Sequence, residues 1–195
     1  MKTSTCIIAA FLCVFFVPCV SGGLLLSDPC AIPAWTGTTN YDSGGVLLAD
    51  VDYAVFAPGD YGGVDPSGGT EYVYAYQVFN NSPDGSISMF SVSLIDGSGA
   101  TGDTIDAGYG GDVTPTNIYI DYGSNSFKIT LFTPSLPAGQ FAEVGLFTSP
   151  NPPVMFVSSV INSGRSVNGA APTPVPEPAT ISLLGLAGLA LLRRK

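Results

Sequence analysis

Carboxylates are the side chains of this sequence best suited to chemistry, because it contains 15 Asp and Glu residues and no His. Four of them lie in one Gly-rich stretch, at Asp96, Asp103, Asp106 and Asp112. Clustered carboxylates and backbone carbonyl oxygens are the ligands that calcium prefers. The stretch lacks the Glu that closes an EF-hand loop. We therefore assign no cofactor and interpret it as an acidic loop, with a structural calcium site at these four residues as the alternative.

Pairs of carboxylates also hydrolyse glycosidic bonds. Asp50 with Asp52 and Asp103 with Asp106 are close pairs in the sequence. A chain this rich in acidic residues offers such pairs whatever its function, and the absence of His removes the usual base for a Ser or Cys nucleophile. We expect a protein that is not an enzyme. A carboxylate-dependent glycan hydrolase is the less favoured interpretation.

Aromatic side chains are a third group with a candidate role, because Tyr and Trp faces stack on the C–H groups of sugars. The candidates near expected loops or strand ends are Trp35, Tyr41, Tyr53, Tyr61, Tyr109, Tyr119 and Tyr122. Tyr is enriched in strands whatever the function, so packing in a core is the favoured interpretation. A polysaccharide-binding surface remains the alternative.

The scaffold for these side chains is predicted to consist of strands. Segments rich in β-branched and aromatic residues are separated by clusters of Gly, Pro, Asn and Asp, which is the pattern of strands joined by turns. The seven expected strands are 46–56, 71–79, 87–95, 118–122, 127–132, 141–147 and 154–161. Without helices between them, they predict an all-β fold: a single β-sandwich, immunoglobulin-like or jelly-roll, over residues 22–169.

Alternation within two of these segments assigns side chains to faces, since a strand has a period of two residues. In segment 71–79, one face is expected to carry Tyr72, Tyr74, Tyr76 and Val78. In segment 87–95, Phe90, Val92 and Leu94 are expected on one face, and Ile87, Met89, Ser91 and Ser93 on the other.

The charge of the expected domain excludes nucleic acid as a partner. Only two of the six basic residues, Lys128 and Arg165, lie between Gly22 and Val175, whereas Glu177 is the single acidic residue outside that span. Affinity for nucleic acid comes from Lys and Arg that neutralise phosphates. A surface this acidic repels a phosphate backbone instead.

The N-terminal segment predicts a secretory signal peptide over residues 1–21. A positive charge at Lys2 precedes an apolar stretch, 7–17, and then Pro18 and small residues. This order is typical of a cleaved export signal. We expect cleavage between Ser21 and Gly22, with cleavage after Gly22 or Gly23 as the alternatives. Each leaves Cys30 as the only cysteine of the exported part and therefore without an internal disulfide partner.

The C-terminal segment predicts a second targeting signal. A linker, 170–174, leads to Val175, Pro176, Glu177 and Pro178, then to an uncharged apolar run, 179–192, and finally to Arg193, Arg194 and Lys195. As a helix the run would reach about 21 Å, a marginal span for a hydrocarbon core of roughly 30 Å. The basic end favours the cytoplasmic side, so we expect a transmembrane helix, at least transiently, with the β domain outside.

The tail from Val175 to Lys195 resembles the PEP-CTERM sorting domain of Gram-negative and related bacteria. The resemblance covers the Pro-Glu-Pro motif, the Leu-, Gly- and Ala-rich run and the basic end. It implies recognition by an exosortase and the export machinery, and removal of the tail. Many family members are exported into an extracellular polysaccharide or biofilm matrix, so the resemblance implies a place at the cell envelope, cell surface or extracellular matrix.

The sequence as a whole therefore favours an exported protein of structural or adhesive type. A secreted polysaccharide-binding module is the alternative, with extracellular polysaccharide as its partner.

Overall fold

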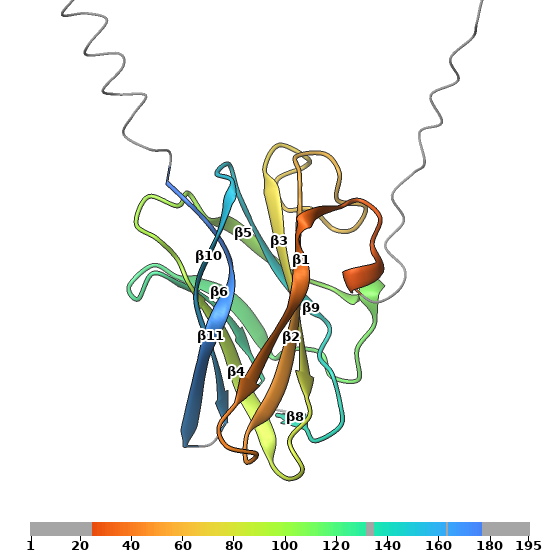
Figure 1. The fold of residues 1–195 in the computed structure, drawn as a ribbon. Coiled ribbons are helices and arrows are strands. Elements are labelled where there is room, and N and C mark those ends of the chain that lie inside the picture. Colours follow the sequence, from red (N-terminus) through yellow and green to blue (C-terminus); the bar gives the residue numbers. More distant parts are fainter. Residues whose placement is uncertain (1–24, 132–134, 163, 177–195) are drawn as a thin grey trace, which may run out of the picture.

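The computed structural model describes residues 25–131, 135–162 and 164–176. They form two antiparallel sheets that pack face to face (Figure 1). One sheet has the strand order β1-β2-β3-β9-β5, and the other has the order β11-β10-β4-β7-β6, with β8 paired to β4. The prediction of an all-β sandwich is confirmed.

The bounds of the elements follow the two sheets. The five-stranded sheet contains β1 (Ala31–Asp42), β2 (Leu48–Phe56), β3 (Tyr72–Asn80), β9 (Val144–Ser149) and β5 (Thr101–Asp106). The six-stranded sheet contains β11 (Arg165–Pro174), β10 (Pro153–Asn162), β4 (Ser86–Ser93), β7 (Ser126–Thr130), β6 (Asn117–Asp121) and β8 (Leu136–Pro137). Two short 3-10 helices, η1 (Leu25–Ser27) and η2 (Ala107–Tyr109), complete the described elements.

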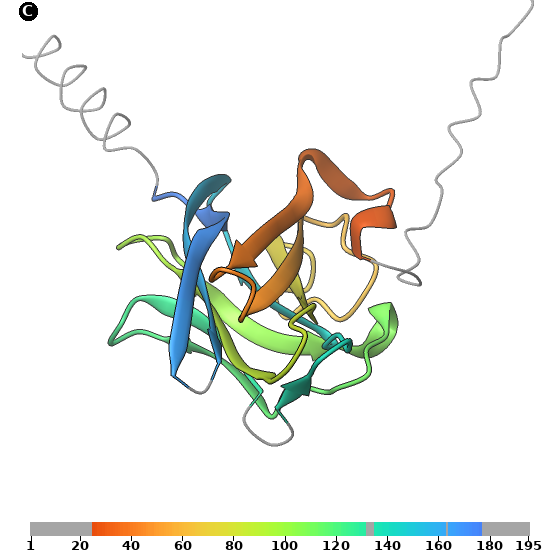
Figure 2. The ribbon, with the colours of Figure 1, turned by 60° about the horizontal axis from the view of Figure 1, so that its bottom comes forward.

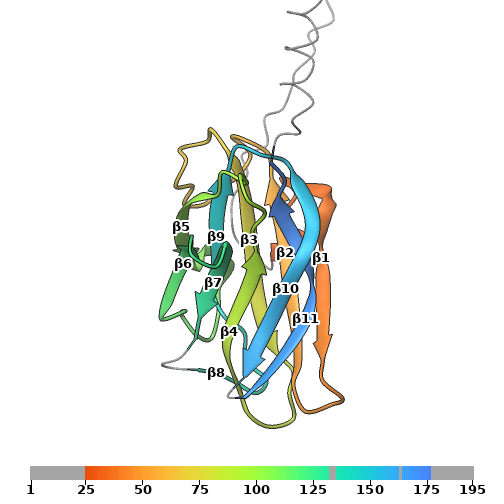
Figure 3. The ribbon, with the colours of Figure 1, turned by 90° about the vertical axis from the view of Figure 1, so that its left-hand side faces the viewer.

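Both sides of the sandwich are closed by contacts between the sheets. Figure 3 places β5 beside β6 at one side and β1 near β11 at the other, and Figure 2 shows β1 in orange next to β11 in blue. The hydroxyl of Thr39 in β1 donates to the carbonyl of Ala170 in β11 at 2.5 Å.

The main core lies between the sheets and is rich in aromatic rings. Tyr74 stacks on Phe147 with ring centroids 5.0 Å apart, and Tyr76 lies 5.8 Å from Phe127 of the opposite sheet. Tyr74, Tyr76 and Val78 are fully buried there, and Tyr72 packs against them in part. The predicted face of this strand is confirmed.

The predicted faces of β4 need one correction, at Ile87. Phe90, Val92 and Leu94 face the core as expected, but Ile87 is also buried in it. The pairing with β10 shifts there, because Met89 opposes Ile161 while Ile87 opposes Asn162. Ser88 is thus an extra residue on β4, and such a bulge reverses the alternation that follows from a regular strand.

Four strands were absent from the sequence prediction: β1, β5, β8 and β11. The last of them corrects the predicted linker, because residues 170–174 form the C-terminal half of β11 and pair with β10. This half is buried apart from Ala170. The hydroxyl of Thr173 donates to the carbonyl of Ser93 at 3.0 Å, which ties the strand to β4. β11 is the edge of its sheet, where prolines are tolerated because one row of N–H groups has no strand partner.

Several expectations concern residues outside the described ranges. These are the signal peptide with Ser21, and the tail with Glu177, Pro178, the run 179–192, Arg193, Arg194 and Lys195. No helix long and apolar enough to cross a membrane is found among the described residues. Cys30 is disulfide-bonded in the structure. The expectation that Cys30 lacks an internal partner concerns the exported part after cleavage, so it stays a prediction.

Candidate functional site

The start of the sorting tail is fixed to the sandwich. The backbone N–H of Val175 donates to the carbonyl of Pro152 at 2.9 Å, which extends the pairing of β10 and β11 by one step. A Cβ placed on Gly97 would lie 3.6 Å from the Cβ of Pro176. Pro176, the first residue of the Pro-Glu-Pro motif, therefore lies against the loop 94–100, with no free spacer before it.

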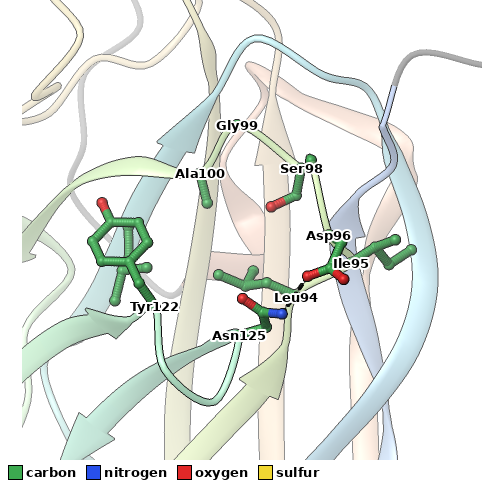
Figure 4. A pocket seen from close by; sticks show the side chains of 10 residues that line it. Leu94, Ile95, Asp96, Ser98, Gly99, Ala100, Tyr122 and Asn125 are labelled. Atoms are coloured by element: carbon green, nitrogen blue, oxygen red, sulfur yellow. Dashed lines mark hydrogen bonds between the residues drawn. The ribbon is translucent and has the colours of Figure 1, made fainter.

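A pocket lies next to this exit point (Figure 4). It has a volume of about 150 Å³ and lies between the loop 94–100 and the turn that joins β6 to β7. Most of its wall is apolar and comes from Leu94, Ala100, Ile120 and Tyr122. Asp96 accepts a hydrogen bond from the side-chain amide of Asn125 at its edge.

The four calcium candidates are not brought together. Asp96 pairs with Asn125, Asp103 accepts from the backbone N–H of Ile120 at 3.2 Å, and Asp112 accepts from that of Phe141 at 3.2 Å. Within the described ranges, no group of three or more acidic, His or Cys side chains is placed to hold a metal ion. Part of the expected loop is strand β5, so those of its backbone carbonyls that face β9 are engaged in sheet pairing.

Asp106 has a structural environment of its own. It is buried and accepts hydrogen bonds from the hydroxyl of Tyr61 at 2.6 Å and from the backbone N–H of Gly108 at 2.7 Å, which caps η2. Burial raises the pKa of Tyr61, and the hydrogen bond to Asp106 raises it further. Asp103 and Asp106 are three residues apart in one strand and project from opposite faces. They form no carboxylate pair.

The seven aromatic candidates do not share one surface. Tyr41, Tyr61 and Tyr109 are buried, while Trp35 and Tyr53 pack against the main core. Tyr61 and Tyr109 cover a second apolar cluster on the outer face of the five-stranded sheet, with Leu25 of η1. The ring of Tyr119 lies 5.7 Å from the ammonium of Lys128, and Tyr122 is exposed. Five of the seven thus pack in or against a core, which is the favoured interpretation, and the seven described residues do not form the shared sugar platform that was its alternative.

The other half of the outer face of the five-stranded sheet is polar and contains shallow pockets. Of its residues, only Asp50 and Asp52 were named from the sequence. Cross-strand pairing places Thr38 opposite Asp52, and Asn40 opposite Asp50, whose partner on β3 is Phe79. Adjoining hollows of about 230 and 280 Å³ share Asp50 and Asn81 in their walls. We call this region the polar hollow, formed by Thr38, Asn40, Asp50, Asp52, Phe79 and Asn81.

The two carboxylates of the polar hollow are held by neighbouring donors. Asp50 accepts from the amide of Asn40 at 2.5 Å on one oxygen and from the amide of Asn81 at 2.8 Å on the other. Thr38 donates to Asp52 at 2.6 Å. Burial raises the pKa of Asp52, the Thr38 hydrogen bond opposes this shift, and the charge of Asp50 adds to it. The pair Asp50 and Asp52 could be named from the sequence, but the amides that bind Asp50 come from Asn40 in β1 and Asn81 after β3.

Comparisons with known proteins bear on the tail alone. Residues 174–195 match the family model described as the PEP-CTERM protein-sorting motif. No curated protein and no solved structure matches the chain. The motif indicates an exported protein that is associated with the cell envelope and sorted through an exosortase. The C-terminal region of this chain, from the last residue of β11 onward, is therefore a PEP-CTERM sorting signal.

Proposed function

We propose that the sandwich is a structural or adhesive component of the cell surface or extracellular matrix, without enzymatic activity, that an exosortase releases from its tail. The observation that carries this proposal is the direct joining of the sorting motif to β11. The sandwich is then the part delivered outside.

Intact-mass spectrometry of the protein recovered from the outside of its host tests the delivery. We expect a product that begins near Gly22 and ends between Pro176 and Pro178. A product that retains Arg193 to Lys195 would mean that the tail is a lasting membrane anchor, and the matrix role would be withdrawn. Fractionation completes the test, because a matrix component should remain with the extracellular material when cells are removed.

A second candidate, polysaccharide binding, is favoured by the polar hollow. Carboxylate and amide groups hydrogen-bond sugar hydroxyls, and the ring of Phe79 offers an apolar face beside them. Phe79 is itself fixed by stacking on Phe141, with ring centroids 5.3 Å apart. Fixed polar groups beside an apolar surface are the usual composition of a ligand site.

Retention on the polysaccharide of the host tests this candidate. Asp50→Ala combined with Asn81→Ala should weaken retention at least tenfold, whereas Asp84→Ala, in an exposed turn, should leave it unchanged. If the double variant binds as tightly as the unmodified protein, the polar hollow is not the binding site.

A further inference from the structure

Exposed apolar side chains gather at one end of the six-stranded sheet. Met155, Phe156 and Val157 follow one another in β10 and are 40%, 40% and 48% exposed, and Tyr122 is 73% exposed. Successive residues of a strand point to opposite faces, so both faces of this part of β10 are uncovered. Among the described strands, this part pairs with β11 alone, because pairing with β4 begins at Ser158.

Strand pairing places these residues at the same level. Ser158 pairs with Val92, which pairs with Phe127, which in turn pairs with Ile120, so these four form one row across the sheet. Phe156 and Tyr122 each lie two residues beyond this row, toward the same end. Three strand spacings separate them, about 14 Å, and the loop 94–100 follows β4 between them.

The sorting tail leaves the sandwich at this same end. Val175 bonds to Pro152, which precedes β10, and Pro176 lies against Gly97 of the loop. The upper left of Figure 1 shows this loop, the turn after β6 and the end of β11 together. Gly97 and Tyr122 also line the pocket of Figure 4.

The length of the tail brings this end close to a bilayer. The apolar run begins at residue 179, three residues after Pro176, and three extended residues span at most about 10 Å. The polar layer on each side of the hydrocarbon core is about 5–8 Å thick. Whenever the run lies in the bilayer, Pro176 and the loop beside it must lie in or against the headgroups.

We propose that this end of the sandwich is a docking surface for an uncharged lipid membrane surface. It is formed by the loop 94–100, Tyr122 and residues 155–157, and it is occupied until the tail is removed. The inference rests on the proposed sorting function. Tyr, Phe and Met side chains suit the boundary between headgroups and hydrocarbon.

The charges near this end fit a neutral surface better than an anionic one. Asp96 accepts a hydrogen bond from the neutral amide of Asn125, which balances no charge, whereas Asp121 forms an ion pair with Lys128 at 2.6 Å. The rest of the domain is strongly acidic and would be repelled by anionic lipids. Docking is therefore expected to be strongest on zwitterionic lipid.

Hydrogen exchange measured by mass spectrometry tests the proposal. The protein is recovered from a host that lacks its exosortase, so that the tail is kept, and is reconstituted into phosphatidylcholine vesicles or into detergent micelles. In vesicles, peptides covering 120–126 and 153–157 should exchange at least fivefold more slowly than in micelles. The peptide around Val64, which is 60% exposed in a different loop, should exchange equally in both.

A pair of variants sharpens the result. Phe156→Ser with Val157→Ser should abolish the protection of 153–157 in vesicles, while Val64→Ser should not. Protection of the tail peptides without protection of 120–126 and 153–157 would overturn the docking surface but leave the sorting function intact. Absence of protection in the tail itself would overturn both. Protection that needs no lipid and rises with protein concentration would identify a second copy of the chain as the occupant and overturn the membrane proposal.

Discussion

The hydroxyl of Tyr76 offers a direct test of whether residues 170–174 are held in the sheet as part of β11. Tyr76 is fully buried, and its hydroxyl donates to the backbone carbonyl of Pro172 in β11. Tyr76→Phe keeps the ring, which packs beside Phe90, Phe127 and Phe147, and removes only this donor. The carbonyl of Pro172, itself buried, then loses its partner.

The expected cost follows from that unpaired carbonyl. A buried polar group without a partner costs about 1–3 kcal/mol. A loss of about 2 kcal/mol lowers the Tm of a domain of this size by about 4–8 °C. In guanidinium chloride, the midpoint of unfolding should fall while the slope m stays unchanged, because the surface exposed on unfolding is the same.

The matched control is Tyr122→Phe, which removes a hydroxyl from an exposed ring and should change stability by less than about 0.5 kcal/mol. Were Tyr76→Phe as mild as this control, Pro172 would not be held in the native sheet. Residues 170–174 would then behave as the linker that the sequence predicted, and the assignment of β11 would be wrong in that half.

Three further predictions concern the site and the turns. Asp52→Asn should stabilise the protein at neutral pH, because burial raises the pKa of this carboxyl and the folded state therefore binds its proton more tightly than the unfolded state. The contribution of Asp52 to stability thus falls as the pH rises above the ordinary pKa of 3.8. In urea unfolding, Asn should increase stability above this window of pH and not below it. Gly111→Ala should lower the Tm more than Gly44→Ala does, because a Cβ at Gly111 would lie 2.3 Å from the backbone nitrogen of Glu143. Gly44 has free space around it, so its substitution meets only the strain of a positive φ of 76°, which costs about 1 kcal/mol. Millimolar calcium should leave the Tm equal to that in EDTA, because the acidic residues of 96–112 accept hydrogen bonds from separate partners; a rise in Tm would restore the calcium site.

The strands that sequence analysis found are those whose own residues favour the conformation. Segment 71–79 became β3 with a shift of one residue, because its Tyr and Val side chains alternate regularly. β5 and β11 contain Gly, Asp, Ala and Pro instead. Such edge strands form because a neighbouring strand pairs with them. That neighbour is distant in the sequence, so the residues of the edge strand do not predict it by themselves.

The candidate site was predictable to the same limited degree. Spacing two residues apart in a strand puts Asp50 and Asp52 on one face, so the pair could be named from the sequence. The amides that bind Asp50 come from Asn40 in β1 and Asn81 after β3, and only the register of three strands brings them together. Tyr61 and Tyr109 are buried, in line with the favoured interpretation of core packing. The second cluster that they cover with η1 was not predicted, because alternation alone leaves that outer face exposed.

The position of the sorting motif also decides whether the sandwich survives processing. The last hydrogen bond described along the chain is that from Val175 to Pro152. A cut between Pro176 and Pro178 therefore removes no hydrogen bond of the described sandwich, whereas a cut before Pro172 would remove the acceptor of Tyr76 and the last three residues of β11. Lengthening the chain between Val175 and Pro176 by six Gly and Ser residues should leave the stability of the sandwich unchanged, and the tether would then no longer force its end against the headgroups. Slower hydrogen exchange at 153–157 that persists after this insertion would show that the apolar end binds lipid on its own, whereas its loss would show that the short tether supplies the contact.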